Sequence, residues 1–254
     1  MIKILELFGG IGACSKALER LGIEYEIADY VEIDKYAVQS FNAMHNTNFE
    51  PQDICKWNKD IEVDLIMHGS PCQDFSLAGK QAGGDEGSGT RSSLMYETIR
   101  IVEKLKPKYV IWENVKNLLS KKHRHNFDAY LETMEQLGYK SYYQVLNAKD
   151  YGIPQNRERI FTISIRNDID KVFELPPKQE LKLKLKDMLE DEVDEKYYLP
   201  DEITKKMSFI SKHELNLNYY NYDEMNRVYT ADYVCPALRT MQGGNRQQKV
   251  FLDD

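Results

Sequence analysis

Short apolar runs alternate with amphipathic segments over the first two thirds of the chain, which is typical of an α/β protein. Mainly apolar runs predict buried strands at 2–8, 25–31, 63–67 and 109–112. Between them, apolar residues recur at helical spacing. The expected helices follow Gly12, span 35–45, run from 91–94 to about 105, and span 126–137. We therefore expect a mostly parallel sheet whose strands are connected by helices.

Two more strands are expected at 141–147 and 159–165. The link between them is short and non-helical, which favours antiparallel pairing at the edge of the sheet. Gln155, Arg157 and Arg159 alternate in this stretch and share one strand face. An arginine pair of this kind is as typical of solvated salt bridges as of a binding site.

The periodic pattern fades after about Asp168. Pro176 and Pro177 mark a break, and the charge-dense stretch 178–195 predicts a surface helix followed by an acidic run. The rest is rich in Tyr, Asn and Arg and has little periodicity. We therefore divide the chain into a first domain, a hinge or linker and a third region, with the bounds 1–167, 168–196 and 197–254.

The composition is that of a globular chain of 254 residues with 42% hydrophobic and 30% charged residues. It contains no run of 18 apolar residues and no signal-peptide pattern at its start, so we expect no membrane span. The four cysteines are far apart and lack metal-ligand spacing, which indicates free thiols, a reducing compartment and no metal site. The net charge of −7 argues only weakly against nucleic acid, because the local field of a cleft matters more than the sum.

A thiol and a carboxylate follow two successive strands. Cys72 lies in the segment 69–76 (GSPCQDFS), after the strand at 63–67, and Glu113 ends the strand at 109–112. Parallel strands end at the same crevice, which is where α/β folds place reactive groups. For a lone cysteine, burial as a small hydrophobe is the alternative.

A glycine turn and two acidic residues suggest a nucleoside site. Gly10 and Gly12 follow Phe8 between the first strand and its helix, and glycines let a ligand approach the backbone. A tight turn without a ligand is the alternative. Glu32 ends the second strand, where a carboxylate can accept both ribose hydroxyls of an adenosine ligand. Asp53 can accept from an adenine amino group, although such a residue alone more often belongs to a turn.

In this order, the features resemble the DNA (cytosine-5)-methyltransferases of bacterial and phage restriction-modification systems. The motifs that carry the resemblance are Phe8-x-Gly10-x-Gly12, Glu32, Gly69-Ser70-Pro71-Cys72-Gln73, Glu113-Asn114-Val115 and Gln155-x-Arg157-x-Arg159. The resemblance is close over about residues 1–165. Over 166–254 it is limited to the general organisation, a hinge followed by a variable target-recognition segment. It implies a Rossmann-like methyltransferase fold that depends on S-adenosyl-L-methionine, with a mostly parallel sheet and an antiparallel edge hairpin. The region 197–254 is then part of a target-recognition region.

The resemblance also implies roles for residues. Cys72 would add to C6 of a flipped-out cytosine in duplex DNA, so that C5 takes the methyl group and S-adenosyl-L-homocysteine is released. Glu113 would hold the base edge, and Arg159, grouped with Arg157, would counter charge on the base oxygen. The glycine-rich segment 79–89 would close over the DNA. The cofactor-site residues are Phe8, Gly10, Ile11, Gly12, Glu32, Ile33, Asp53, Ile54 and Pro71. The substrate-binding residues are Ser70, Gln73, Ser76, Asn114, Gln155, Arg239, Thr240, Gly243 and Gly244.

The family continues after its recognition region with final motifs that have no counterpart before Asp254. On this basis we expect a truncated or split chain, inactive or poorly active alone, which is monomeric or complemented by a C-terminal fragment. The implied partners are double-stranded DNA and a cognate restriction endonuclease, in the cytoplasm of a bacterium or phage-infected host. Two alternatives stay open: a tRNA cytosine-5 methyltransferase, and a non-catalytic DNA-binding fragment or half of a two-chain enzyme.

Overall fold

The computed structural model describes residues 1–71, 94–238 and 247–252. The chain forms two compact units. Unit 1 comprises Met1–Val145 and Arg159–Glu174, and unit 2 comprises Leu146–Glu158 and Leu175–Asp254. The two units are defined by contacts between residues. The division of the sequence at 167 and 196 instead separates a catalytic domain, a linker and a recognition region, and it stays a prediction.

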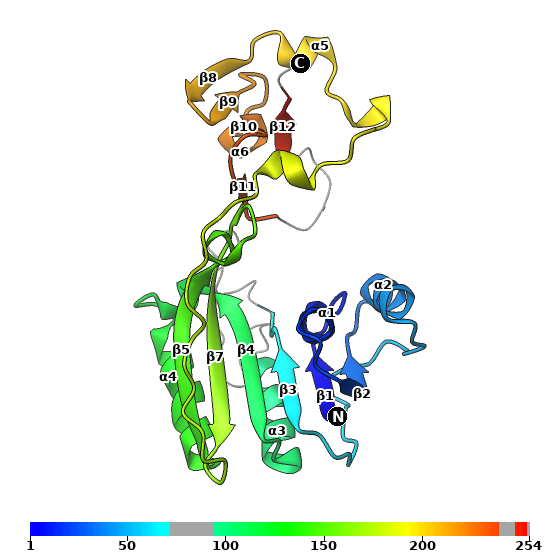
Figure 1. Ribbon diagram of the computed structural model, residues 1–254, viewed down its shortest axis with the longest axis vertical. Coiled ribbons are helices and arrows are strands. Elements are labelled where there is room, and N and C mark those ends of the chain that lie inside the picture. Colours follow the sequence, from blue (N-terminus) through cyan, green and yellow to red (C-terminus); the bar gives the residue numbers. More distant parts are fainter. Residues whose placement is uncertain (72–93, 239–246, 253–254) are drawn as a thin grey trace. The chain divides into compact units, whose positions relative to one another are not determined.

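Unit 1 is built on a six-stranded sheet with the order β2-β1-β3-β4-β7-β5 (Figure 1). Its strands are β1 (Ile2–Leu7), β2 (Tyr25–Val31), β3 (Leu65–His68), β4 (Tyr109–Val115), β5 (Tyr139–Asn147) and β7 (Glu158–Arg166). β1 is parallel to β2 and β3, and β3 is parallel to β4, whereas β7 is antiparallel to β4. The predicted fold class, a mostly parallel α/β sheet, is confirmed.

The edge hairpin of β5 and β7 also agrees with the sequence. The amide of Asn167 donates to the Gly138 carbonyl at 2.9 Å, and the amide of Ala148 donates to the Arg157 carbonyl at 3.1 Å. From Gly138 to Ala148 the chain advances along β5, while the partners go back from Asn167 to Arg157 along β7. The two strands therefore run antiparallel.

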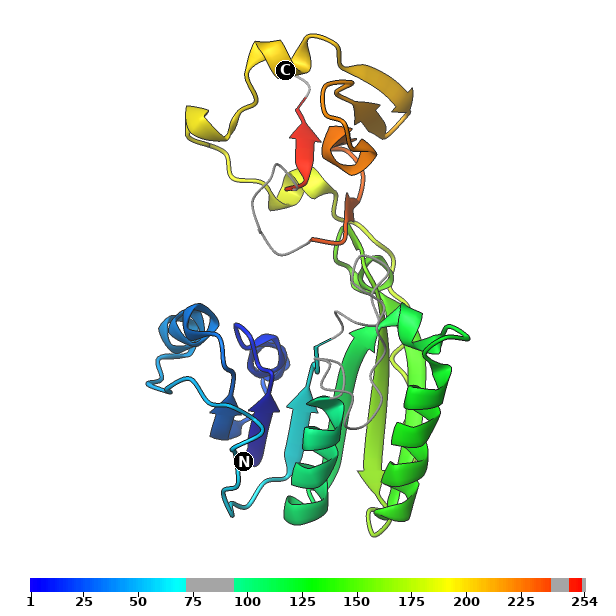
Figure 2. The ribbon, with the colours of Figure 1, turned by 180° about the vertical axis from the view of Figure 1, so that it is seen from behind.

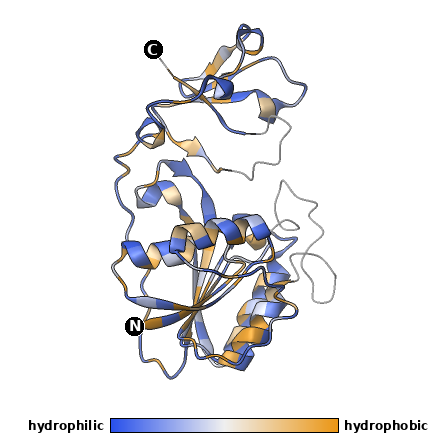
Figure 3. Ribbon diagram, turned by 90° about the vertical axis from the view of Figure 1, so that its right-hand side faces the viewer, coloured by the Kyte–Doolittle hydropathy of each residue, from blue (hydrophilic) through white to orange (hydrophobic). Residues whose placement is uncertain are grey.

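Helices cover both faces of this sheet, because successive side chains of a strand point to opposite faces. The helices are α1 (Ala13–Arg20), α2 (Lys35–His45), α3 (Met95–Leu105) and α4 (Arg124–Gln136), with a 3-10 turn η2 (Lys116–Leu119). Leu5, Leu7 and Ile66 pack with residues of α3 and α4, which lie in front of the sheet when it is seen from behind (Figure 2). Ile4 and Met67 pack with Leu18 of α1. Each helix carries both apolar and polar residues along its length (Figure 3).

Local caps explain why α2 agrees with the prediction over 35–45. The Asp34 side chain accepts hydrogen bonds from the amides of Tyr36 and Ala37 at 2.7 and 3.2 Å. Asn46 ends the helix with a left-handed backbone at a φ of 52°. Both signals can be read in the sequence next to the helix.

Unit 2 contains short strands where the sequence showed little periodicity. A four-stranded sheet has the order β12-β10-β9-β8, and β6 pairs with β11. The strands are β6 (Gln155–Asn156), β8 (Ser208–Ser211), β9 (Glu214–Asn216), β10 (Arg227–Thr230), β11 (Cys235–Pro236) and β12 (Lys249–Phe251). The helical pieces are η3 (Ala148–Tyr151), η4 (Leu185–Met188), η5 (Glu195–Tyr197), α5 (Asp201–Thr204) and α6 (Asp223–Asn226).

The surface helix predicted within 178–195 is wrong. The 3-10 turn η4 lies within this stretch, and η5 begins only at its last residue. The amides of Leu185 and Lys186 donate instead to the carbonyls of Tyr233 and Ala231, at 2.8 and 2.9 Å. A distant segment of backbone thus takes the hydrogen bonds that a helix would make internally.

Across the described ranges, which omit 72–93, 239–246 and 253–254, no helix has the length and apolar character needed to cross a membrane.

Candidate active site

The turn between β1 and α1 is tied to the end of β2. Phe8, Gly10 and Gly12 have positive φ angles of 54°, 54° and 84°. The Gly10 amide donates to Glu32 Oε2 at 3.2 Å, and the Gly10 carbonyl accepts from the Tyr30 hydroxyl at 2.6 Å. Both backbone groups of Gly10 are therefore held by β2 or the residue that follows it.

Gly10 and Gly12 are needed for different reasons. A Cβ at Gly12 would lie 2.7 Å from the Phe41 ring and also strike His45, so this position is closed by packing. A Cβ at Gly10 would meet nothing within 4 Å. The backbone at Gly10 therefore has free space beside it, whereas the backbone at Gly12 does not.

Glu32 is oriented by the chain around it. Its Oε1 accepts from the amides of Ile33 and Asp34, at 2.8 and 2.9 Å. Two predicted cofactor residues beside this region, Ile11 and Ile33, are 54% and 69% exposed. An oriented carboxylate, free space beside a glycine backbone and exposed apolar side chains are groups that can contact a nucleoside.

The segment around Asp53 is fastened to the same end of β2 through Gln52. The Gln52 amide donates to the Glu32 carbonyl at 2.8 Å. Its side-chain nitrogen donates to Asp29 Oδ1 at 3.0 Å and to the Tyr30 carbonyl at 2.7 Å. These bonds place Asp53 and Ile54, two predicted cofactor residues, directly beside the residues that follow β2.

Asp29 is a functional candidate that the sequence reasoning missed. It is 3% exposed, and its carboxylate also accepts from Trp57 Nε1 at 2.7 Å and Lys59 Nζ at 2.8 Å. Burial favours a higher pKa for Asp29, but the hydrogen bonds from Lys59, Trp57 and Gln52 outweigh it and hold the pKa below its ordinary value. An acidic residue inside the apolar run 25–31 was the available signal.

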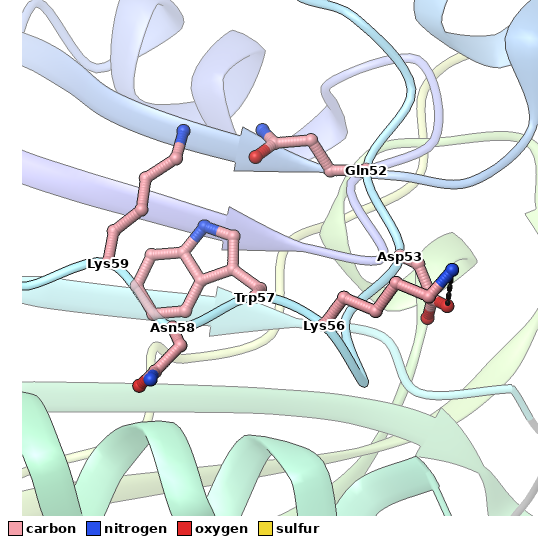
Figure 4. Close-up of a pocket in the computed structure, with 6 residues that line it drawn as sticks. All are labelled: Gln52, Asp53, Lys56, Trp57, Asn58 and Lys59. Carbon is pink, nitrogen blue, oxygen red and sulfur yellow. Dashed lines mark ion pairs between the residues drawn. The ribbon is translucent and has the colours of Figure 1, made fainter.

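The segment after Gln52 borders a hollow of about 430 Å³. The residues that line it are Gln52, Asp53, Lys56, Trp57, Asn58 and Lys59 (Figure 4). Its two lysines face carboxylates of this chain, Lys56 at 3.9 Å from Asp53 and Lys59 at 2.8 Å from Asp29. Asp53 itself accepts from the Cys55 amide at 3.0 Å, which orients its carboxylate at the edge of the hollow.

Glu6 is a second buried carboxylate that the sequence reasoning did not single out. It is 1% exposed on β1, and its Oε1 accepts from the Ser15 amide at 3.0 Å and from the Ser15 hydroxyl. Burial raises the pKa of Glu6, and the Ser15 hydrogen bonds partly offset that rise. Glu6 fixes the first turn of α1 behind the glycine turn.

Two side chains of β4 hold the residue that comes two positions before Cys72. Trp112 Nε1 donates to Ser70 Oγ at 3.0 Å, and Asn114 Nδ2 donates to the Ser70 carbonyl at 3.4 Å. Ser70 and Asn114 are 3% and 1% exposed. The backbone that enters the Cys72 segment is therefore anchored from inside the sheet, and Pro71 next to it is half-buried.

Glu113 and Arg159 meet at the same end of the sheet. Arg159 Nε lies 3.0 Å from Glu113 Oε1, and their side chains are 21% and 33% exposed. A Cβ at Gly69 would be 3.7 Å from Glu113 Oε2, so the carboxylate borders the segment that leads to Cys72. The structure thus brings together Glu113, Arg159 and the entry to the cysteine segment.

The remaining predicted site residues lie elsewhere. Arg157 and Gln155 belong to unit 2, where β6 is parallel to β11 and the Arg157 amide donates to Asn147 Oδ1 at 3.1 Å. The predictions that lie outside the described residues concern Cys72, Gln73, Ser76, the segment 79–89, Arg239, Thr240, Gly243 and Gly244.

Comparison with known proteins identifies the family. Residues 2–250 match the family model described as C-5 cytosine-specific DNA methylase. The orphan methyltransferase M.SPBetaI of Bacillus phage SPbeta is 31% identical, over 98% of this chain and 73% of its own. The type II methyltransferase M2.ScrFI of Lactococcus lactis subsp. cremoris is 36% identical, over 78% of this chain and 70% of its own. In fold, a crystal structure of Spodoptera frugiperda DNMT2 has a TM-score of 0.74 at 21% identity and covers 98% of this chain and 72% of the other. The chain therefore belongs to the C-5 cytosine-specific DNA methylases, a family of enzymes that transfer methyl groups.

Proposed function

We propose that this protein transfers a methyl group from S-adenosyl-L-methionine to C5 of cytosine in duplex DNA, through a temporary bond between Cys72 Sγ and C6. The observation that carries the proposal is the Glu113–Arg159 pair, with 3.0 Å between Oε1 and Nε, beside Gly69. A carboxylate and a guanidinium at the entry to a cysteine segment supply the groups that an activated pyrimidine needs.

The chemistry explains the need for a thiol. C5 of cytosine is a weak nucleophile, and addition of the Cys72 thiolate to C6 moves an electron pair toward C5. When bound, the cofactor supplies an electrophilic methyl group to that carbon. Loss of the C5 proton to a base and departure of the thiolate from C6 then restore the aromatic ring. The target base must leave the helical stack, because the duplex covers its ring faces.

Glu113 and Arg159 bind the base during this sequence. The Glu113 carboxyl group accepts from the exocyclic amine and shares a proton with N3, and the Arg159 guanidinium faces the base oxygen, where negative charge develops. Because the two side chains already contact each other, their orientation does not have to be created when the base arrives. Arg157, two positions earlier in the sequence, belongs to unit 2 and is proposed to contact the DNA there.

Ser70 and Asn114 receive positioning roles in place of the predicted contact with DNA. Both side chains are buried, and Ser70 is hydrogen-bonded to Trp112 and Asn114 of β4, which leaves little surface for a substrate. Their contribution is to hold the backbone before Cys72, with Pro71 restricting the next residue.

The cofactor site is proposed at the ends of β1 and β2. Glu32 accepts the ribose hydroxyls, and Asp53 faces the adenine edge; the Ile54 side chain is 5% exposed and packs in the core, so only its backbone is proposed to face the base. Ile11 and Ile33 cover its apolar surface, and the turn from Phe8 to Gly12 leaves room at Gly10. The support for this site is the exposure of Ile11 and Ile33, the space at Gly10 and the bonds that fasten Gln52 to β2.

Unit 2 is proposed to select the DNA sequence. Gln155, Arg239, Thr240, Gly243 and Gly244 are the proposed DNA contacts there, and Gln73 and Ser76 are those that follow Cys72. The short strands and many polar side chains of unit 2 suit a surface that reads base edges. The bacterial and phage sources of the relatives favour action in the cytoplasm of such a cell.

Trapping on fluorinated DNA tests this function. The protein is incubated with S-adenosyl-L-methionine and mixed-sequence duplexes in which 5-fluorocytosine replaces cytosine, and covalent complexes are resolved on a denaturing gel. Fluorine at C5 does not leave as a proton does, so the adduct persists. The wild-type protein should form the adduct, Cys72→Ser should form none, and Cys55→Ser, which changes an exposed thiol, should behave as wild type.

A parallel assay of methyl transfer to unmodified duplex DNA and to tRNA separates the candidates. Transfer to tRNA alone would favour an RNA substrate. An adduct that persists in Cys72→Ser would overturn the assigned nucleophile.

A further inference from the structure

We propose that Tyr30 is a positioning residue for the cofactor, whose hydroxyl fixes the Gly10 carbonyl and so holds the glycine turn in its ligand-accepting conformation. The inference deepens the proposed function and rests on the cofactor site assigned to Gly10 and Glu32.

The hydrogen bonds at Gly10 carry the first step. The Tyr30 hydroxyl donates to the Gly10 carbonyl at 2.6 Å, and Glu32 accepts from the Gly10 amide at 3.2 Å. Residues 30 and 32 are two positions apart in extended chain and share a face, so both reach the same turn. Gly10 is held at a φ of 54°, with open space where a Cβ would stand.

The Tyr30 ring itself cannot turn away. It is fully buried and stacked on Phe41, with ring centroids 3.9 Å apart and planes 23° apart. A Cβ at Gly9 would lie 2.6 Å from this ring, and one at Gly12 would lie 2.7 Å from Phe41. The two stacked rings thus fill the space beside Gly9 and Gly12, and the hydroxyl bonds the residue between them.

Tyr30 also reaches the other wall of the site. Its backbone carbonyl accepts from the Gln52 side chain at 2.7 Å, and Gln52 immediately precedes Asp53. One residue of β2 therefore contacts both the turn that faces the cofactor and the segment assigned to adenine. Burial, with Glu32 nearby, raises the pKa of Tyr30, so the hydroxyl keeps its proton and remains a donor.

The Tyr30 bond becomes most important when the cofactor binds. In the proposed site the Glu32 carboxylate accepts ribose hydroxyls, which compete with the Gly10 amide for the same oxygens. The bond from Tyr30 does not involve Glu32, so it keeps the turn in place during that exchange. A turn that is fixed in advance costs less free energy to order when the ligand binds.

The test compares Tyr30→Phe with Tyr139→Phe. Tyr139 lies in β5, is 2% exposed, and donates its hydroxyl to the Pro107 carbonyl at 2.7 Å. Each variant therefore removes one buried hydroxyl-to-carbonyl bond from unit 1, so similar losses of melting temperature are expected. Binding of S-adenosyl-L-homocysteine is measured by calorimetry, and turnover is measured over a range of S-adenosyl-L-methionine concentrations.

We expect Tyr30→Phe to raise the dissociation constant and the KM for the cofactor about fivefold or more, with kcat nearly unchanged, as for loss of a hydrogen bond that supports binding. Tyr139→Phe should leave both within about twofold. Equal cofactor affinity in the two variants would overturn the proposal. So would a Tyr30→Phe protein that fails to fold while Tyr139→Phe folds, because the hydroxyl would then serve folding.

Glu32→Ala separates this inference from the proposed function. If Glu32→Ala leaves cofactor affinity unchanged, the assigned cofactor site is wrong and the inference falls with it. If Glu32→Ala weakens binding and Tyr30→Phe does not, the site stands and the role of Tyr30 is rejected.

Discussion

Buried polar side chains in unit 1 lie next to the turns of the candidate active site. Glu6 and Asp29 are 1% and 3% exposed, and each accepts hydrogen bonds from residues beside the proposed cofactor site. His68 is 3% exposed directly before Gly69, with its ring stacked on Trp112 at a centroid distance of 5.6 Å. Burial lowers the pKa of His68 to about 3, so the folded protein keeps this imidazole neutral.

His68 should make the protein sensitive to mild acid. In the unfolded chain the imidazole takes up a proton below about pH 6.5, whereas the folded state takes it up only near the lower pKa. The free energy of unfolding therefore falls as the pH drops below about 6.5, by about 1.4 kcal/mol per pH unit. His68→Phe removes this titration, so the loss of stability between pH 7 and pH 5 should be about 2 kcal/mol smaller than in the wild type.

Urea denaturation of both proteins at several pH values measures this difference. Phenylalanine preserves a ring against Trp112, so a comparison at pH 7 separates packing from titration. Parallel curves for the two proteins from pH 7 to pH 5 would show that His68 is not the source of the acid sensitivity.

At the scale of elements, a predicted helix or strand agrees with the structure where the signals that define it are adjacent in sequence. The predicted segments 25–31 and 35–45 coincide with β2 and α2, since strand patterning and the caps at Asp34 and Asn46 are adjacent in sequence. The predicted helix within 178–195 fails because its amides bond to a segment more than forty residues away, at about 231–233. No local pattern encodes such a pairing.

In the candidate site, too, locally encoded features could be predicted and features that depend on tertiary contacts could not. Strand ends indicated Glu113 beside the entry to the Cys72 segment, and the structure places them together. Neither the clamp of Asp29 on Trp57 and Lys59 nor the burial of Asn114 could be read from the sequence, because both depend on which side chains meet across the sheet.

The hydrogen bond between Trp112 of β4 and Ser70, which follows β3, gives a prediction at this scale. Ser70→Ala removes the acceptor of Trp112 Nε1, and a buried donor left without a partner costs about 1–3 kcal/mol. It also frees the backbone before Cys72, and small misplacements of reacting groups can slow a reaction about tenfold or more. We expect slower adduct formation on 5-fluorocytosine DNA, measured by quenched time courses.

Ser164→Ala is the matched control. Ser164 is equally buried in unit 1, and its hydroxyl lies 2.8 Å from the Ser141 hydroxyl, between β7 and β5. This variant should lose stability and keep a nearly normal rate of adduct formation. Equal rates for the two variants would contradict a positioning role for Ser70.

At the scale of the whole molecule, contacts divide the chain into two compact units. Residues 146–158 belong to unit 2. There β6 is parallel to β11, Asp150 lies 2.7 Å from Lys178, and the Gln179 amide donates to the Asp150 carbonyl at 2.8 Å. The stretch that carries Gln155 and Arg157 is thus built into the unit proposed to read DNA.

This arrangement predicts how recognition can be transferred. In one chimera, residues 175–254 are replaced by the corresponding residues of the SPbeta phage relative, and in a second chimera residues 146–158 are replaced as well. Both should methylate the site of the donor, which sequencing of methylated cytosines detects. The second should melt at the higher temperature, because it keeps matched partners across β6 and β11 and around Asp150. An active chimera that retains the original site would reject unit 2 as the reader of sequence, and equal melting temperatures would show that the pairing of β6 with β11 contributes nothing to stability.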